Sequence, residues 1–447
     1  NKKIKMKFFY ALIILILFQN CSFDNKTGIW KNDNIISREN DDVFKEFETL
    51  STINKSFDEE IYIDVKFQFP SSKIINNLQW KDVFYSESNN LKNFKYNGLN
   101  EQIFKSKKIS KYKINDLILY EENHLIVGDE NGNLIVFSIN KNKKITKFNF
   151  YKKKYKKIKK KLNLIIEDKI IYVSDNIGYL YAFDIRKNKI IWAKNHKIPF
   201  RSNLKLSGNK LIASNQNNNL FFFDKNNGDI LKLIPTEETI LKNKFINNLS
   251  LDDNSIFFLN TYGSLYSVDI ASMKLNWFVN LNQSLDLDFS NLFFGNQVVN
   301  DRKDKIVISS NYYTYIINSK TGSILYKKNL SSKFRPIILN NYLFLITKKN
   351  LLVSINLITG EIVYSYDINR QIAEFINTKK QTVQIKNIML VNNNILITLK
   401  NSYILTFSIS GILDEVNDLP SKINSEPIII NGSILYLNHR NKLLIVD

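Results

Sequence analysis

Residues that could do chemistry are few in this chain and lie far apart. The histidines are His124, His196 and His439, and Cys21 is the only cysteine in 447 residues. None of them has the spacing of a metal site, and neither a Gly-x-Ser-x-Gly elbow nor a phosphate-binding loop occurs. Carboxylates such as Asp184 recur at one position of a repeat, where capping a turn is the expected role. The sequence therefore predicts no catalytic residue, no metal site and no bound cofactor.

A repeated pattern of about 40 residues must position whatever function the chain has. "GYLYAFDIRKNKIIWAKN" begins at Gly178 and "GSLYSVDIASMKLNWFVN" at Gly263, and the two agree at eight of eighteen positions. Weaker copies begin at Gly132, Asn218, Tyr312, Asn350, Ser402 and Asn441. Eight copies at this period indicate a solenoid, a propeller or an array.

The residues within one copy indicate a propeller. "YLYAFDI" and "KIIWAKN" alternate and are rich in β-branched and aromatic residues, which is typical of strands. The links between such runs carry residues that tolerate positive φ, such as Gly322, Gly360 and Asn188. Two further apolar runs precede each copy, which makes four antiparallel strands per unit. The sequence predicts an all-β, eight-bladed β-propeller of four-stranded antiparallel blades over residues 58–447.

The chain ends suggest how the ring closes. The last copy reaches Asp447 with its third strand, so a fourth strand must come from elsewhere in the chain. "NNLQWKDVF", residues 76–84, has the fourth-strand pattern, and Trp80 stands where Trp192 and Trp277 stand in their copies. We therefore expect this N-terminal strand to complete the last blade against residues 440–447.

The N-terminal residues indicate export. A basic start and an apolar run over residues 8–18 precede Cys21, and the run is too short to span a bilayer. This arrangement resembles a bacterial lipoprotein signal, which implies a signal peptide over residues 1–20, lipid on Cys21 and a flexible tether over residues 21–57. Ser22 resembles the sorting preference for the outer membrane. The alternative is an ordinary signal with an incidental cysteine.

The net charge of +21 is unevenly spread, and the run "KKKYKKIKKK" at 152–161 supplies eight lysines. Enrichment in Lys, Asn, Ile, Phe and Tyr is typical of an AT-rich genome. The lysine run is expected to be a solvated loop that could meet anionic lipid head groups or an acidic partner. Nucleic acid is not an expected partner of an exported protein.

Residues 182–192, "AFDIRKNKIIW", resemble the propeller repeat of pyrroloquinoline-quinone proteins, Ala-x-Asp-x-x-x-Gly-x-x-x-Trp. In that family the tryptophan docks between neighbouring blades; here Trp192 and Trp277 match it, with Tyr326 and Tyr364 as aromatic replacements. One branch comprises dehydrogenases that hold quinone and calcium, often beside a vicinal disulfide that one cysteine cannot form. The other is the outer-membrane assembly factor BamB family, eight-bladed lipoproteins without a cofactor, and the chain resembles this branch.

The resemblance implies a non-catalytic scaffold lipoprotein at the periplasmic face of the outer membrane, which binds the POTRA domains of BamA within the barrel assembly complex. In that family a loop with the pattern Leu-x-Leu-Arg contacts BamA, and Ile198, Phe200 and Arg201 match it in spacing and character. The paired aspartates of the next inter-blade loop are replaced by Asn247 and Asn248. The alternatives are a quinone-dependent dehydrogenase and a general binding lipoprotein with another partner.

Overall fold

The structure is a computed structural model that describes residues 21–23, 30–32, 57–151, 155–239, 246–282 and 293–447. The chain divides into two compact units, residues 1–55 and residues 56–447. In the first unit, β1 (Cys21–Phe23) pairs antiparallel with β2 (Trp30–Asn32). The predicted signal peptide, 1–20, and most of the predicted tether, 21–57, lie outside the described residues and stay predictions.

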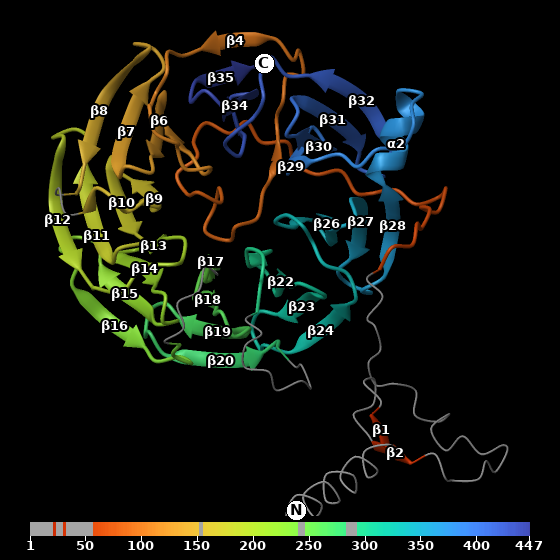
Figure 1. The fold of residues 1–447 in the computed structure, drawn as a ribbon, viewed down its shortest axis with the longest axis horizontal. Helices are drawn as coiled ribbons and strands as arrows, with labels where there is room; N and C mark the ends of the chain where they lie inside the picture. The colour runs from red at the N-terminus through yellow and green to blue at the C-terminus, as the bar shows by residue number, and fades with distance from the viewer. Residues whose placement is uncertain (1–20, 24–29, 33–56, 152–154, 240–245, 283–292) are drawn as a thin grey trace, which may run out of the picture. The chain divides into compact units, whose positions relative to one another are not determined.

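The second unit is the predicted ring of eight antiparallel blades (Figure 1). Blades 1 to 4 are β5 (Leu119–Glu121), β6 (His124–Gly128), β7 (Asn133–Ser138), β8 (Lys143–Asn149); β9 (Leu162–Glu167), β10 (Ile170–Asp175), β11 (Tyr179–Asp184), β12 (Lys189–Asn195); β13 (Lys205–Ser207), β14 (Lys210–Ser214), β15 (Leu220–Asp224), β16 (Ile230–Ile234); and β17 (Asn248–Leu251), β18 (Ser255–Leu259), β19 (Ser264–Asp269), β20 (Leu275–Asn280). Blades 5 to 8 are β21 (Val299–Asn300), β22 (Lys305–Ser309), β23 (Thr314–Asn318), β24 (Ile324–Lys328); β25 (Ile337–Leu339), β26 (Tyr342–Ile346), β27 (Leu351–Asn356), β28 (Ile362–Asp367); β29 (Ile385–Val391), β30 (Asn394–Leu399), β31 (Tyr403–Ser408), β32 (Leu413–Asp418); and β33 (Ile428–Ile430), β34 (Ser433–Leu437), β35 (Leu443–Val446), β4 (Gln102–Lys105).

The predicted repeat corresponds to the third and fourth strands of each blade. Third strands such as β11 are almost fully buried, because apolar side chains on both faces pack against neighbouring blades. Fourth strands such as β12 alternate between exposed and buried residues, because they form the outer rim of the ring. The all-β prediction is confirmed, with one short helix among the described residues, α2 (Ile368–Phe375), inserted between blades 6 and 7.

The tryptophan of one blade docks onto the next blade, as the repeat pattern predicts. The indole of Trp192 in blade 2 donates its N–H to the carbonyl of Lys225 in blade 3, at 3.0 Å. A Cβ on Gly228, which has φ +76°, would lie 2.6 Å from this indole, so the turn requires glycine both for its backbone angle and for space. Trp277 repeats the arrangement on Gly322. This contact locks adjacent blades together.

An N-terminal strand closes the ring, but the predicted segment was wrong. The fourth strand of the last blade is β4, whose Phe104 lies opposite Ile445 of β35. Residues 76–84 lie instead along the inner strands, where Trp80 exchanges two backbone hydrogen bonds with Tyr120 of blade 1, at 2.7 and 2.9 Å. Trp80 suggested the wrong segment, because β4, which completes the last blade, contains no tryptophan.

We predict that Trp192→Ala lowers the free energy of unfolding by about 3–5 kcal/mol, because it removes a buried aromatic side chain and its hydrogen bond between blades. The matched control is Ile191→Ala on the same strand, whose exposed side chain should contribute less than about 0.5 kcal/mol. Thermal or denaturant unfolding measures both variants. Equal stability of the two variants would refute the locking role of Trp192.

Candidate functional site

The strands of each blade alternate in direction, so the ring has two distinct faces. The loops between blades and the turns between second and third strands lie on one face, called here the loop face. The turns between first and second and between third and fourth strands lie on the other, called the turn face. The innermost strand of each blade lines the central channel, so any site on the ring axis would lie among these first strands.

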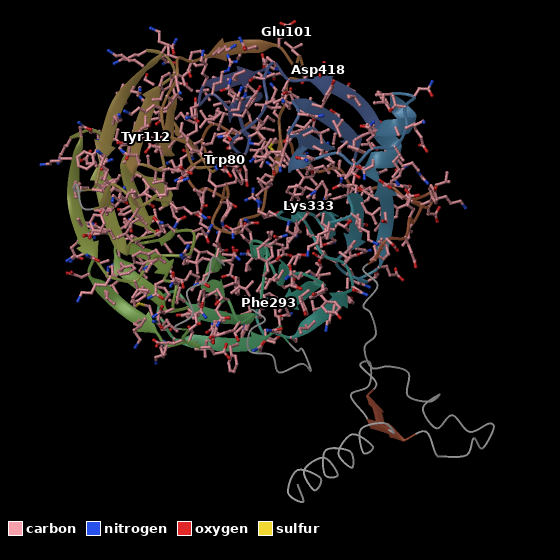
Figure 2. All side chains as sticks on the ribbon, viewed as in Figure 1. Trp80, Glu101, Tyr112, Phe293, Lys333 and Asp418 are labelled. Carbon is pink, nitrogen blue, oxygen red and sulfur yellow. The ribbon has the colours of Figure 1, made fainter. Side chains whose placement is uncertain are left out.

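The chain's own residues 75–97 occupy this channel, and we call them the channel insert. Trp80, in the first third of the insert, lies near the centre of the ring (Figure 2). The insert contacts the first strand of every blade in turn. Hydrogen bonds join Asn77 to Ile429 of blade 8, Trp80 to Tyr120 of blade 1, Lys81 to Ile166 of blade 2, Asp82 to Lys205 of blade 3, Glu87 to Leu251 of blade 4, Ser88 to Asn300 of blade 5 and Asn90 to Ile338 of blade 6. In blade 7, Asn93 is the parallel strand partner of Leu390.

Asparagine side chains make much of this contact. The amide of Asn89 donates to the carbonyls of Leu249 and Val298, at 2.8 and 2.7 Å. The amide of Asn90 donates to the carbonyl of Ile338 and accepts from its N–H, both at 2.9 Å. A side-chain amide carries a donor and an acceptor as a peptide group does. It can therefore satisfy the free edge of an inner strand where a full strand has no room.

A buried lysine fixes the insert from blade 3. The ammonium of Lys205, fully inaccessible to solvent, donates to the carboxylate of Asp82 at 2.7 Å, to the amide oxygen of Asn89 at 2.6 Å and to the carbonyl of Ser86 at 2.9 Å. Burial lowers the pKa of Lys205, and the Asp82 carboxylate opposes that shift. All three donors of the ammonium are used, so the role of Lys205 is structural.

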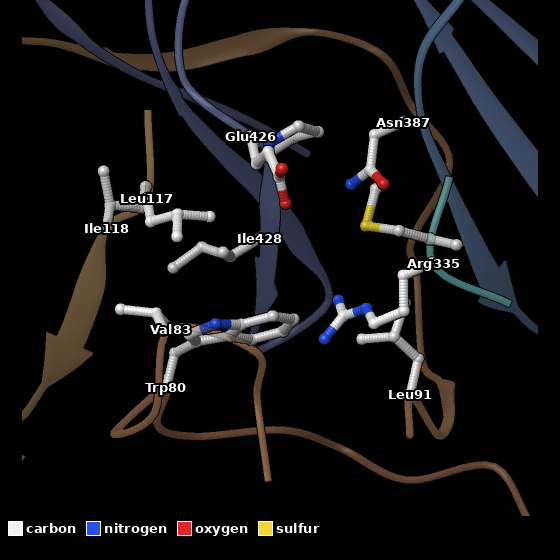
Figure 3. A pocket seen from close by; sticks show the side chains of 11 residues that line it. Trp80, Val83, Leu91, Leu117, Ile118, Arg335, Asn387, Glu426 and Ile428 are labelled. Atoms are coloured by element: carbon white, nitrogen blue, oxygen red, sulfur yellow. The ribbon is translucent and has the colours of Figure 1, made fainter. Parts of the chain in front are cut away.

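An arginine holds the insert from the opposite side of the ring. The guanidinium of Arg335, just before blade 6, donates to the carbonyls of Phe84 and Asn89, at 2.6 and 3.1 Å. The side chains of Arg335 and Glu426 both point into a small cavity next to the Trp80 indole (Figure 3). This cavity of about 10 Å³ is about the size of one water molecule. Among the described side chains it offers packing and no room for a substrate.

Larger hollows open on either side of the insert. The one on the loop face has a volume of about 470 Å³, and its lining includes Lys113, Lys159, Lys161 and Glu426. The one on the turn face has a volume of about 350 Å³ and a mixed lining that includes Lys81 and Glu167. Within the described residues no three His, Cys, Asp or Glu side chains gather as a metal site would require.

The three residues predicted to bind a partner lie together in the loop between blades 2 and 3. Phe200 is 2% exposed and packs edge-on against His196 and Phe223, so its ring faces inward rather than outward. Ile198 and Arg201 are half-buried on the loop face, and Arg201 donates to the amide oxygen of Gln216 at 3.0 Å. The geometry leaves Ile198 and Arg201 as the members of the set that can touch another molecule.

The neighbouring asparagines are held within the propeller. Asn247 donates to the hydroxyl of Ser214 and to the carbonyl of Asn215, at 2.9 and 2.8 Å. Asn247 and Asn248 are both buried, so neither presents a side chain to solvent as a partner contact would require.

Sequence reasoning missed the residues that hold the channel. One signal for Lys205 was available: a lysine between two leucines, Leu204 and Leu206, in a first strand that faces the channel. Residues 86–90, "SESNN", are small and polar, which is typical of a loop in solution and does not indicate burial. Asn89 and Asn90 are nevertheless 0% and 6% exposed.

Fold and channel together define the class of protein. The ring is an eight-bladed propeller whose blades are joined by docked tryptophan and tyrosine side chains, and its axis is filled by its own N-terminal residues. A family model described as outer membrane protein assembly factor BamB matches residues 131–366, just over half of the chain. The chain belongs to this family. No curated protein sequence matches the chain significantly.

Solved structures share the fold at low sequence identity. BamB from Moraxella catarrhalis aligns with a TM-score of 0.60 and 13% identity over 78% of this chain and 99% of that one. The quinohemoprotein alcohol dehydrogenase ADHIIG from Pseudomonas putida HK5 aligns with a TM-score of 0.58 and 8% identity, over 83% and 80% of the two chains. The designed protein Ika8 gives 0.58 and 12%, over 77% and 99%. These likenesses establish the propeller and no activity.

We predict that Lys205→Met destabilises the protein by about 3–5 kcal/mol, because it leaves the Asp82 carboxylate buried without its cation. Lys232→Met, on the exposed strand β16, removes the same charge and should cost less than about 0.5 kcal/mol. Denaturant unfolding measures both, and hydrogen exchange should show faster exchange in residues 82–89 of the Lys205 variant. A Lys205→Met protein as stable as its control would show that this ion pair does not hold the insert.

Proposed function

We propose that this protein is a non-catalytic scaffold of the machinery that assembles β-barrels in the outer membrane, binding the POTRA region of BamA. The observation that carries the proposal is the filled channel of a BamB-family propeller. Since residues 75–97 occupy the ring axis and bond to every blade, the surfaces that remain for function are the two faces and the rim. Those surfaces suit a binding protein.

The loop between blades 2 and 3 is the proposed contact with BamA. Ile198 and Arg201 lie on either side of the buried Phe200 in the sequence, and the packing of Phe200 sets their position. An arginine beside an apolar side chain is a frequent centre of binding energy in protein interfaces. The half-buried guanidinium is held by Gln216, and burial lowers the pKa of Arg201. Such a side chain loses little freedom when a partner binds.

We predict that Arg201→Glu abolishes copurification with BamA, because it places a carboxylate where the partner meets a cation. Since Arg201 is half-buried, Ile198→Asp serves as a second variant in the same loop, and Lys187→Glu on the turn face is the matched control. Thermal melting of each variant separates loss of binding from loss of fold. BamA retained by both loop variants would place the interface elsewhere on the ring.

Attachment to the membrane follows in this proposal from lipid on Cys21. Among the described residues no helix is long and apolar enough to cross a membrane. We predict that Cys21→Ala moves the protein from the outer-membrane fraction to the soluble periplasmic fraction, as measured by fractionation and immunoblotting. Cys21→Ser should give the same result, since it also lacks the thiol while keeping a polar side chain of similar size. A variant that still sediments with outer membranes would show that lipid is not the anchor.

A quinone-dependent dehydrogenase is the second candidate, favoured by the fold shared with a quinohemoprotein alcohol dehydrogenase. The residues on the ring axis do not provide the calcium and quinone site of such enzymes, because the channel insert fills it and acidic ligands are not grouped there among the described residues. Adding pyrroloquinoline quinone with calcium to the purified protein tests this directly. A stoichiometric change of quinone absorbance would replace the scaffold proposal.

A further inference from the structure

The loop face carries a concentration of lysine that neither the fold nor the proposed BamA contact uses. Two neighbouring inter-blade loops, 106–118 before blade 1 and 155–161 before blade 2, contain nine cations, and all nine are lysines. Eight of them are exposed and form what we call the lysine patch: Lys107, Lys108, Lys111, Lys113, Lys156, Lys157, Lys159 and Lys161. The ninth, Lys160, is buried and donates to the carbonyl of Tyr155 at 2.6 Å.

The patch is one continuous surface. The N–H of Glu130 donates to the carbonyl of Lys113 and the N–H of Lys160 donates to the carbonyl of Glu130, both at 2.9 Å. These bonds tie the two loops to the turn that separates them. The amide of Asn441 donates to the carbonyls of Ser110 and Tyr112, so that the turn bearing the exposed Arg440 adjoins the same patch.

In blades 1 and 2 the excess of lysine over acidic residues is larger on the loop face than on the turn face. On the loop face, the two loops and the turns 129–132 and 176–178 of blades 1 and 2 hold nine lysines against the three acids Asp116, Asp129 and Glu130. On the turn face, the turns 122–123, 139–142, 168–169 and 185–188 of the same blades hold four cations against two acids. A lysine-rich genome explains many lysines but not this larger positive excess on one face.

The first described residues of the propeller unit also lie on the loop face. The N–H of Phe57 donates to the carbonyl of Asn329, in the loop between blades 5 and 6, at 3.1 Å. The carboxylate of Asp58 pairs with Lys349 in a loop-face turn, at 2.6 Å. Residues 57 and 58, where the described part of the propeller unit begins, therefore lie on the face that carries the lysine patch.

We propose that the loop face lies against an anionic phospholipid bilayer, with the lysine patch as its electrostatic contact. Protein interfaces favour arginine and are depleted in lysine, whereas clustered lysines are typical of attraction to anionic lipid head groups. Ile158, 45% exposed between the lysines, and Phe375 with Ile376 at the end of α2, 50% and 48% exposed, offer apolar contacts on the same face. In one respect this inference rests on the proposed function, in which a lipid on Cys21 holds the protein at the bilayer.

The loop that carries Ile198 and Arg201 lies on the same face, next to the patch. Arg201 and Lys161 line one small cavity together. The propeller would then meet the bilayer and the proposed partner with the same face. A partner that is itself embedded in the membrane requires this. An acidic surface of that partner is the competing occupant of the patch, and the test separates the two.

The test is flotation of the full chain carrying Cys21→Ala, so that no acyl chain contributes. The vesicles are phosphatidylcholine alone or phosphatidylcholine with about one-third phosphatidylglycerol, at about 0.15 M salt, where exposed charges act over about 8 Å. We expect binding to the anionic vesicles only, and release at about 1 M salt. Replacing Lys107, Lys108, Lys156 and Lys157 by Gln should weaken this binding at least about tenfold.

The matched control replaces four exposed turn-face lysines by Gln, Lys141, Lys187, Lys189 and Lys320, and changes the net charge equally. This control should bind the anionic vesicles as the parent does. Equal binding by the two four-fold variants, or no preference for anionic vesicles, overturns the proposal. If the patch variant instead loses BamA while no protein binds vesicles, the patch is a protein interface and the membrane proposal is wrong. Neither result bears on the effect of Arg201→Glu, which tests the proposed function separately.

Discussion

The structure depends on how the free edges of eight inner strands are satisfied. A propeller blade has a fourth strand at the rim and a first strand at the channel, and the first strand presents N–H and C=O groups toward the ring axis. Buried without partners, such groups would each cost about 1–3 kcal/mol. The channel insert supplies partners through its backbone and through the amides of Asn77, Asn89 and Asn90. Lys205 and Arg335 then fix the insert from opposite sides of the ring.

This arrangement decides where function can reside. A ring whose axis is open can place a ligand among its first strands, where all blades converge. Here that position is taken by the protein itself, and the remaining hollows are divided between two faces of unequal charge. The functional proposals therefore concern surfaces: the loop with Ile198 and Arg201 for a protein, and the lysine patch for a bilayer. Both lie on the loop face, where sequence changes do not disturb the strand ladders.

The repeat could be predicted from sequence because each copy carries its own structural signal. One contact recurs between neighbouring blades, in which an aromatic ring packs on a glycine of the next blade. It requires glycine at Gly228 and Gly322 and an aromatic side chain at Trp192 and Trp277. The channel insert has no such signal, because its contacts reach across the whole chain and each is made once. Asn89 donates hydrogen bonds to Leu249 and Val298, and the local sequence around these residues does not predict this pairing. For the same reason Trp80 matched the repeat by residue type, although it lies in the channel insert and its partner, Tyr120, lies in blade 1.

The same long-range contacts couple filling of the channel to closure of the ring. The insert ends at residue 97, and β4 begins five residues later as the outermost strand of the last blade. Asn97 donates to the carbonyl of Gly432 in that blade, so few residues separate the channel from the closing seam. Strand β35, the partner of β4, is the last strand of the chain, so this pairing spans almost the whole propeller. Because the partners of the insert include both blade 1 and blade 8, the insert has its full set of partners only when the first and last blades meet. The insert is buried more completely than the rim strands because it lies on the ring axis, where the first strands of all eight blades surround it.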